Sequence, residues 1–304
     1  MAKSNLPKKK LSKMARKEER TAYMFLLPNF IGFLIFTLVP VVLGFIISFT
    51  DYNGFKWHFV GISNYIKMFK DSQFLTALKN NLLYSLATVP LTLIFALILA
   101  LAVDKAFLGS GFFKTVYFFP NLTSMVAIGC VAMMLFNPTA GPINSFLSSL
   151  GVSKESLPKW FMSTKSALWT VILVVVWKQA GYYMILFIGG LKAIPQHLYE
   201  AAKIDGANSW QSFWYITRPM LSPTIFMCLI LCIIASFQVF DIINVTTQGG
   251  PGRATTVLVF RIYTEGFTNW KMGYASAMAY FLFMIVLVVT LIQWRGQKNW
   301  VVED

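Results

Sequence analysis

Six apolar runs, each long enough to cross a lipid bilayer as a helix, dominate this sequence of 304 residues. They lie near residues 23–49, 82–103, 116–136, 167–191, 223–245 and 274–294. A transmembrane helix needs about 20 mostly apolar residues, and unpaired backbone groups cannot face hydrocarbon. The pattern therefore predicts an all-α polytopic membrane protein with six transmembrane helices. Kinks are predicted at four prolines inside these runs, namely Pro28, Pro40, Pro90 and Pro120.

Composition agrees with a membrane protein, because 57% of the residues are hydrophobic and 12% are charged, whereas charged residues make up about a quarter of a soluble domain. The formal net charge of +14 does not indicate nucleic-acid binding, because the basic residues flank the apolar runs instead of forming one patch. All three cysteines, Cys130, Cys228 and Cys232, lie inside apolar runs. We predict that they are small buried side chains and not disulfide partners or metal ligands.

Lysine and arginine in the connecting segments predict the orientation, because these residues are enriched on the cytoplasmic side. Residues 1–22 form a basic tail with eight Lys and Arg. With this tail inside, the inner segments hold 15 of the 26 basic residues and the outer segments hold 10, while Lys178 lies within a span. We therefore predict that residues 1–22 and 295–304 are cytoplasmic tails flanking a six-helix transmembrane domain at 23–294.

A polar segment, residues 192–222, separates the fourth and fifth apolar runs and is predicted to be cytoplasmic. A short helix is expected over 195–204, with Gly206 ending it, and Asn208 or Ser209 can begin a second helix. This second helix carries Trp210, Phe213 and Ile216 on one face, and Pro219 and Pro223 are predicted to end it. Such a bent pair suits docking to a soluble partner or, equally from pattern alone, an amphipathic helix on the membrane surface.

Polar side chains inside the spans are costly and commonly face a cavity or the bundle interior. The candidate pathway residues are Lys178, Gln179 and Tyr182 in the fourth run, and Ser236, Gln238 and Asp241 in the fifth. A second interpretation is open for two of them, since Lys178 and Asp241 could instead form a structural ion pair.

The polar segment resembles the signature loop of the membrane subunits of ATP-binding-cassette (ABC) importers. The matching residues are Glu200, Ala201, Ala202 and Gly206, then Ile216 and Pro219, whereas Arg218 stands where the family often has Leu. Further stretches, WKQAGYYMILFIGGLKAIPQHLYEAAKIDGA, FQVFDIINVTTQGGPGRATTVLVFRIY and GYASAMAYFLF, resemble the carbohydrate branch of that family in the expected order. The resemblance covers nearly the whole chain.

The resemblance implies a type I ABC importer permease fold for the domain at 23–294, in a bacterial cell membrane, and a set of partners. These are a second homologous permease, two cytoplasmic ATPase subunits, an extracellular solute-binding protein, membrane lipid, and a sugar or oligosaccharide as substrate. The chain has no G-x-x-x-x-G-K-[ST] loop for phosphates, so ATP and Mg would be bound by the partner ATPase. The ATPase-coupling residues would be Glu200, Ala201, Ala202, Asp205, Gly206, Ile216 and Pro219.

The resemblance also places sugar contacts in the regions of Gln179, Tyr182, Ser236 and Gln238. Other functions remain open, namely a secondary transporter or channel not driven by ATP, or an ABC permease for a solute other than sugar. We expect no enzyme, because the two histidines, His58 and His197, are far apart in sequence and on opposite sides of the predicted membrane. The segment TTQGGPG at 246–252 predicts a tight turn, with contact to the binding protein as a second interpretation.

Overall fold

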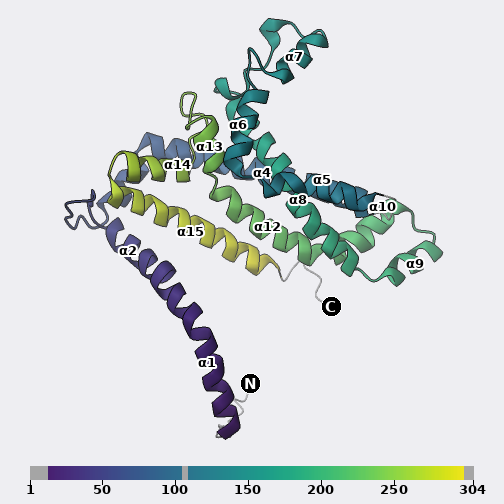
Figure 1. Cartoon of the computed structure of the whole chain (residues 1–304), viewed down its shortest axis with the longest axis horizontal. Coiled ribbons are helices and arrows are strands. Elements are labelled where there is room, and N and C mark those ends of the chain that lie inside the picture. Colours follow the sequence, from purple (N-terminus) through teal and green to yellow (C-terminus); the bar gives the residue numbers. More distant parts are fainter. Residues whose placement is uncertain (1–12, 105–108, 298–304) are drawn as a thin grey trace.

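The computed structural model describes residues 13–104 and 109–297, so most of the two predicted tails, residues 1–12 and 298–304, lies outside the described residues. Figure 1 shows long helices packed side by side, with α1 projecting from one side and α6 with α7 from the other. The α-helices are α1 (Lys13–Phe33), α2 (Val39–Ser48), α3 (Ser63–Lys70), α4 (Ser72–Asp104), α5 (Ser110–Leu122), α6 (Met125–Leu135), α7 (Pro142–Ser149), α8 (Ala167–Ala193), α9 (Gln196–Ile204), α10 (Ser209–Ser212), α11 (Arg218–Met220), α12 (Ser222–Phe237), α13 (Asp241–Thr246), α14 (Leu258–Tyr263) and α15 (Met272–Gln297). Shorter turns are η1 (Leu34–Leu38), η2 (Lys154–Ser156), η3 (Trp160–Met162), η4 (Phe213–Thr217) and η5 (Thr264–Thr268).

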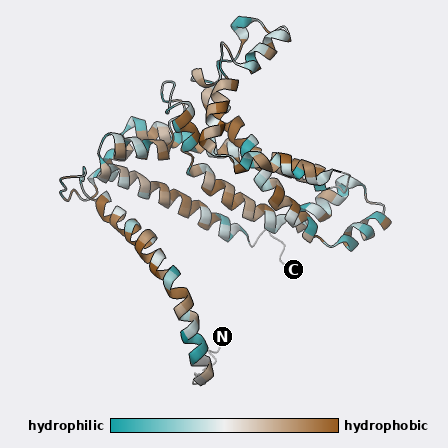
Figure 2. Cartoon of the chain, viewed as in Figure 1, coloured by the Kyte–Doolittle hydropathy of each residue, from teal (hydrophilic) through white to brown (hydrophobic). Residues whose placement is uncertain are grey.

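Five helical segments of the described chain are long and apolar enough to cross a membrane. They cover Lys17–Ser48, Ser72–Asp104, Ala167–Ala193, Ser222–Thr246 and Met272–Gln297. The sixth candidate is the pair α5 and α6, which would make one broken span. Figure 2 shows hydrophobic residues along these helices and hydrophilic residues toward α9 and at the tip that carries α7. The all-α polytopic architecture predicted from the sequence is confirmed.

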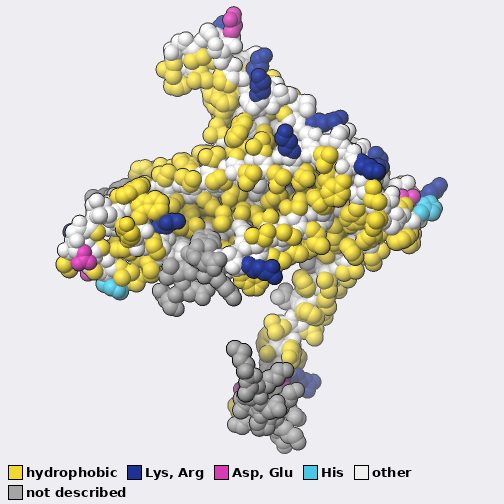
Figure 3. All heavy atoms as spheres, turned by 180° about the vertical axis from the view of Figure 1, so that it is seen from behind, with side chains coloured by type: hydrophobic (Ala, Val, Ile, Leu, Met, Phe, Trp, Pro, Cys, Tyr) yellow, Lys and Arg dark blue, Asp and Glu magenta, His cyan; other side chains and the backbone are white. Residues whose placement is uncertain are grey.

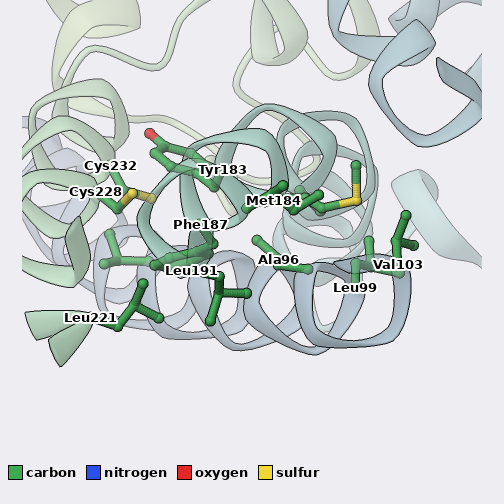
Figure 4. Packing of buried hydrophobic residues seen from close by; sticks show 14 of the residues in the cluster. Ala96, Leu99, Val103, Tyr183, Met184, Phe187, Leu191, Leu221, Cys228 and Cys232 are labelled. Atoms are coloured by element: carbon green, nitrogen blue, oxygen red, sulfur yellow. The ribbon is translucent and has the colours of Figure 1, made fainter. Parts of the chain in front are cut away.

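The central core lies between α4, α8 and α12. Small side chains on α4, such as Ala96 and Ala100, let α8 pack closely, while Met184 and Phe187 of α8 fill the space between them. Figure 4 shows Tyr183 and the thiols of Cys228 and Cys232 at one side of this cluster. Each fully buried side chain of this size contributes about 1.5–3 kcal/mol relative to an exposed one where water is the alternative; in lipid, close packing supplies the attraction instead.

Two of the expected spans are not continuous helices. The third breaks after Leu122, and α5 and α6 meet at 97°. Pro120 in the last turn of α5 has no N–H to donate, and Thr123 takes an extended conformation (φ −79°, ψ 144°). The fifth span unwinds between α12 and α13, over Gln238 to Phe240. The kink predicted at Pro120 is therefore found as a sharp bend that divides the third span, whereas the prediction of a continuous helix over 223–245 is wrong at Gln238 to Phe240.

The bend also corrects the prediction for one cysteine. Cys228 and Cys232 are buried, as predicted, but Cys130 is exposed. Cys130 lies on α6, which leaves the bundle after the bend, so that one face of α6 is uncovered by this chain. An apolar run in the sequence does not distinguish a face buried by protein from one facing lipid or another subunit.

A charged cluster closes the end of the bundle that carries α14. The Arg261 Nη2 lies 3.2 Å from Asp71 Oδ2 and 2.9 Å from Glu265 Oε1. Lys271 Nζ lies 3.5 Å from the other Glu265 oxygen, and the Tyr274 hydroxyl donates to Asp71 Oδ2 at 2.9 Å. Glu265 is only 3% exposed. These contacts join the start of α4 to α14, η5 and α15.

Figure 3 shows, on the opposite face from Figure 1, acidic and histidine side chains at the extremities and hydrophobic ones between them.

Burial by itself would raise the pKa of Asp71, but hydrogen bonds from the Gln73 N–H, the Tyr274 hydroxyl and Arg261 outweigh it and hold that pKa below its ordinary value. A carboxyl group with a depressed pKa in the folded state stabilises the fold above its unfolded pKa, which is about 3.9. That contribution is lost as the pH falls through the lower folded pKa.

We predict that Arg261→Met destabilises the folded chain by about 3 kcal/mol, because it leaves the buried Glu265 and Asp71 without their shared cation. Lys271→Met is the matched control, since it removes the half-exposed partner of the same Glu265 and should cost no more than about 1 kcal/mol. Thermal unfolding in detergent micelles measures both. Equal losses in the two variants would contradict the assignment of Arg261 as the essential cation.

Candidate functional site

A small polar cavity lies where the two broken spans meet α4 and α8. Its volume is about 150 Å³. It is lined by Tyr84, Met125, Val175, Gln179, Ala235, Gln238, Val239, Phe240, Asp241 and Ile242. Three of the six predicted pathway residues, Gln179, Gln238 and Asp241, are therefore brought together in one place. Four separate segments of the chain contribute to it.

The break in the fifth span explains why the cavity is polar. Over Gln238, Val239 and Phe240 the backbone leaves the helical path, with φ −144° and ψ −60° at Phe240. Backbone that is not helical at membrane depth is tolerated where it is buried in protein or lines a water-filled cavity. Broken helices of this kind form solute sites in many transporters. The site therefore offers amide, carboxylate and peptide groups to a polar solute.

The other three predicted pathway residues do not line this cavity. Ser236 is buried, and its hydroxyl donates to Ser85 on α4 at 2.9 Å. Tyr182 is exposed on the outside of α8 and its ring meets that of Tyr183 at 5.2 Å. Lys178 points toward α5. Their assignment to the pathway remains a prediction that no contact in the structure supports.

Lys178 and Asp241 do not form the ion pair considered from the sequence. The Lys178 ammonium donates to the backbone carbonyl of Asn121, 3.3 Å away, and none of the ion pairs among residues 13–104 and 109–297 includes Lys178. Residues 178 and 179 are adjacent on α8 and point about 100° apart. Gln179 therefore faces the cavity with Asp241, whereas Lys178 faces the end of α5.

Sequence reasoning missed several residues that shape the cavity. Tyr84 and Met125 line it, although each reads as an ordinary core residue within an apolar run. Phe240 lines it too, and its ring lies 5.1 Å from that of Tyr263 and 6.4 Å from that of Phe260. The only signal in the sequence was the cluster of polar residues from 236 to 241, which marked the segment but not its neighbours.

At the opposite end of the molecule, α9 to α11 form a bent helical hairpin. Helix α9 covers Gln196–Ile204, as predicted, and Gly206 follows it with φ +80°. Asn208 then caps α10 with a reciprocal pair of bonds to Gln211, of 2.9 and 2.8 Å. The Tyr199 hydroxyl lies 2.9 Å from the Thr217 hydroxyl and joins the two arms. This last contact was not foreseen from the sequence.

The predicted coupling residues are divided between the surface and the base of the hairpin. Glu200, Ala201, Asp205 and Gly206 are exposed, while Ala202, Ile216 and Pro219 are partly covered. Pro219 does not end the second helix as predicted, because the chain continues helically through Met220. The backbone stays helical from Ser209 through Met220, with the wider π-helical turn η4 directly before α11.

The turn at 246–252 lies beyond α13, at the far end from the hairpin. It is a tight turn, as predicted, with positive φ at Gln248, Gly249 and Gly252. Part of it lines a second cavity of about 570 Å³, together with residues of α6 and of the segment that follows it. This cavity is lined by Met133, Phe136, Asn137, Pro138, Phe161, Met162, Thr246, Thr247, Gly250 and Pro251.

Residues 89–295 match the protein family described as binding-protein-dependent transport system inner membrane component. This range includes α8, α12, α13 and the hairpin. The chain belongs to that family. This permease is 37% identical over 299 residues to the probable ABC transporter permease protein YesP of Bacillus subtilis, an alignment that covers 96% of this chain and 95% of that protein. It is 35% identical over 246 residues to the sn-glycerol-3-phosphate transport system permease protein UgpA of Agrobacterium fabrum, covering 81% and 83%.

The fold of the permease matches a solved structure of a bacterial alginate ABC transporter in complex with an alginate pentasaccharide-bound periplasmic protein. The TM-score is 0.82 at 26% sequence identity, over 93% of this chain and 96% of that chain. The ABC importer permease fold expected from the resemblance is confirmed. The permease is a transport component and not an enzyme. It works in a system with a solute-binding protein and an ATPase partner.

Proposed function

We propose that this permease forms half of the translocation pathway of an ATP-driven importer for a sugar or oligosaccharide. The observation that carries the proposal is the meeting of Gln179, Gln238 and Asp241 in one cavity between helices that are long and apolar enough to span a membrane. Relatives named for alginate and glycerol-3-phosphate transport support a hydroxyl-rich substrate.

The chemistry of the lining fits such a substrate. Each sugar hydroxyl needs both a donor and an acceptor, which the side-chain amides of Gln179 and Gln238 and the Asp241 carboxylate supply together. The aromatic rings of Tyr84 and Phe240 offer flat apolar faces to a pyranose ring. Gln238 and Asp241 are exposed in the isolated chain, so they remain open to solute. Lys178, Tyr182 and Ser236 would shape the pathway from outside this lining.

Three further subunits, a second permease and two ATPases, would complete the proposed pathway and drive transport through it. A second homologous permease would cover α1, whose apolar segment buries none of its residues in this chain. Two ATPase subunits, which bind ATP and Mg, would bind the hairpin through Glu200, Ala201 and Asp205. Gly206 would form the bend of the hairpin. Rigid-body closure of the ATPases would then move the helices around the cavity.

This assignment fixes the proposed orientation in a bacterial cell membrane. The hairpin and both termini lie on the cytoplasmic side, and the turn at 246–252 with the second cavity lies outside, where the solute-binding protein would dock. The greater number of Lys and Arg in the segments on the hairpin side supports this orientation.

The test is uptake by the assembled system. We expect the co-expressed permeases, ATPases and binding protein to import radiolabelled mono- or oligosaccharides into proteoliposomes only with ATP and the binding protein present. Glycerol-3-phosphate and an amino acid serve as competing substrates. Uptake without nucleotide, or import of the amino acid in preference to every saccharide, would contradict the proposal.

Variants of the cavity then test the site within the same assay. Gln179→Ala and Gln238→Ala should each raise the KM for saccharide by about three- to ten-fold, the loss expected for one or two hydrogen bonds. Gln293→Ala, which removes the same amide from α15 away from the cavity, should leave the KM unchanged. A normal KM in both cavity variants would remove these residues from the substrate site.

A further inference from the structure

Lys178 is a charged group buried within a membrane span without an acidic partner among the described residues. Its side chain is in the interior, with 8% of the residue exposed, and its ammonium donates to the Asn121 carbonyl. Asn121 lies in the last turn of α5. The last four carbonyls of a helix have no partner within that helix, and together they carry a partial negative charge. Lys178 therefore contacts the C-terminal end of α5, where a positive charge is favourable.

A second contact on the same face of α8 holds α5 in place. Gly181 lies one turn after Lys178, and a Cβ atom there would stand 1.9 Å from the Tyr117 carbonyl oxygen. The backbone of α5 therefore rests directly on α8. Tyr117 and Asn121 are themselves one turn apart, so the two antiparallel helices are joined at two successive turns, immediately before the chain bends.

The bend begins where these contacts end. After Asn121 and Leu122, Thr123 is extended and Ser124 caps α6 by accepting from the Val126 N–H at 3.3 Å. Met125, the first residue of α6, lines the polar cavity. Because α6 starts at the edge of this cavity, the direction in which it leaves the bend determines the shape of the cavity wall.

Helix α6 transmits its position to the other broken span. Gly129 lets α13 approach, since a Cβ at this position would lie 3.2 Å from the Val245 side chain and 3.3 Å from that of Ile242. Helix α13 begins with Asp241, which lines the same cavity. The outer halves of the third and fifth spans therefore pack as one unit beside the cavity, and the bend at Thr123 is one of the connections of this unit to the bundle.

We propose that Lys178 is a positioning residue, which holds the bend of the third span by capping the end of α5 and thereby fixes the α6–α13 wall of the cavity. It acts through the helix and touches neither Asp241 nor the solute. Its effect on transport rests on the function proposed above, whereas its effect on the bend does not.

The test measures the bend directly, in the assembled transporter without solute. Spin labels replace Phe112 of α5 and Met134 of α6, both well exposed, in a chain whose three cysteines have been substituted. We expect a narrow distance distribution in the parent chain and in Lys178→Arg, which keeps a cationic donor. In Lys178→Met the distribution should broaden toward longer distances. A label pair at Trp169 and Ile185, both within α8, should not change.

An unchanged Phe112–Met134 distribution in Lys178→Met would overturn the proposal. If Lys178→Met does not assemble, the same measurement is made on Lys178→Gln, whose shorter neutral donor should also broaden the distribution, and an unchanged distribution there has the same meaning. A double-mutant cycle with Asp241→Asn gives an independent result. Additive effects on thermal stability are expected, and a coupling between the two positions would favour the ion pair instead.

Because no saccharide enters these measurements, they separate the two proposals. A transporter that fails to import sugar but shows the expected distances would leave the role of Lys178 intact. Normal saccharide import with unchanged distances in Lys178→Met would remove that role and leave the proposed function standing.

Discussion

Gly206→Pro should abolish ATP-driven uptake and reduce the amount of ATPase that co-purifies with the permease by at least about ten-fold, equivalent to about 1.4 kcal/mol of binding free energy. Gly206 has φ +80°, whereas proline is fixed near −65°. The Gly206 N–H also donates to the Lys203 carbonyl at 3.2 Å, and the Ala207 N–H donates to Ala202 at 2.9 Å. This is a Schellman motif, and proline removes both its conformation and one of its two bonds.

The chain provides a closely matched control at Gly151, which ends α7. Its φ is +91°, its N–H donates to the Ser148 carbonyl at 3.0 Å, and the Val152 N–H donates to Leu147 at 3.2 Å. A Cβ would meet nothing within 4 Å at either glycine. Gly151→Pro therefore makes the same local change at the other end of the molecule, and ATPase recovery should stay normal. Equal recovery of the ATPase from both variants would remove the hairpin from the coupling interface.

Gly181→Ala should destabilise the folded chain by about 3 kcal/mol, because it places a methyl group in the close contact between α8 and α5. The new Cβ would lie 1.9 Å from the Tyr117 carbonyl oxygen and 2.6 Å from its carbon, and both atoms belong to the backbone. Neither can rotate away, so α5 must move off α8. We expect a lower thermal unfolding midpoint in detergent micelles and a lower yield of folded permease.

Gly189→Ala is the control on the same helix, eight residues further along. A Cβ at Gly189 would meet nothing within 4 Å, and alanine has a higher helix propensity than glycine by about 1 kcal/mol. Gly189→Ala should therefore keep or raise the unfolding midpoint. Similar midpoints for the two variants would mean that α5 and α8 do not rest on each other through Gly181.

Much of this fold follows from local sequence rules. The fourth span is predicted at 167–191 and is found at Ala167–Ala193, because Ser166 and Pro195 bracket a long run that is apolar apart from a few residues such as Lys178 and Gln179. The bend of the hairpin is also predicted correctly, since Gly206 and Asn208 are residues whose conformational preferences act within a few positions. The end predicted for its second helix at Pro219 is not found. These features depend on neighbours in the chain.

The breaks in the third and fifth spans could be predicted only in part. Pro120 predicts a kink in the third span but not a bend of 97° after Leu122, and the single Gln238 between apolar residues does not show that α12 ends there. The cavity depends on these breaks, which is why Gln179, Gln238 and Asp241 were found from polarity but Tyr84 and Met125 were not. Lys178 was assigned to the correct span, but its partner is a backbone carbonyl, which leaves no trace in the sequence.

The unwound stretch from Gln238 to Phe240 has one more effect. Peptide groups that are not bonded within a helix stay polar whatever side chains the chain carries there. Mutation can therefore reshape the lining of the cavity without making it wholly apolar. Descendants of such a protein can change cargo through a few substitutions while keeping a polar lining, and the loss of less than one turn of regular helix gives the lineage that freedom.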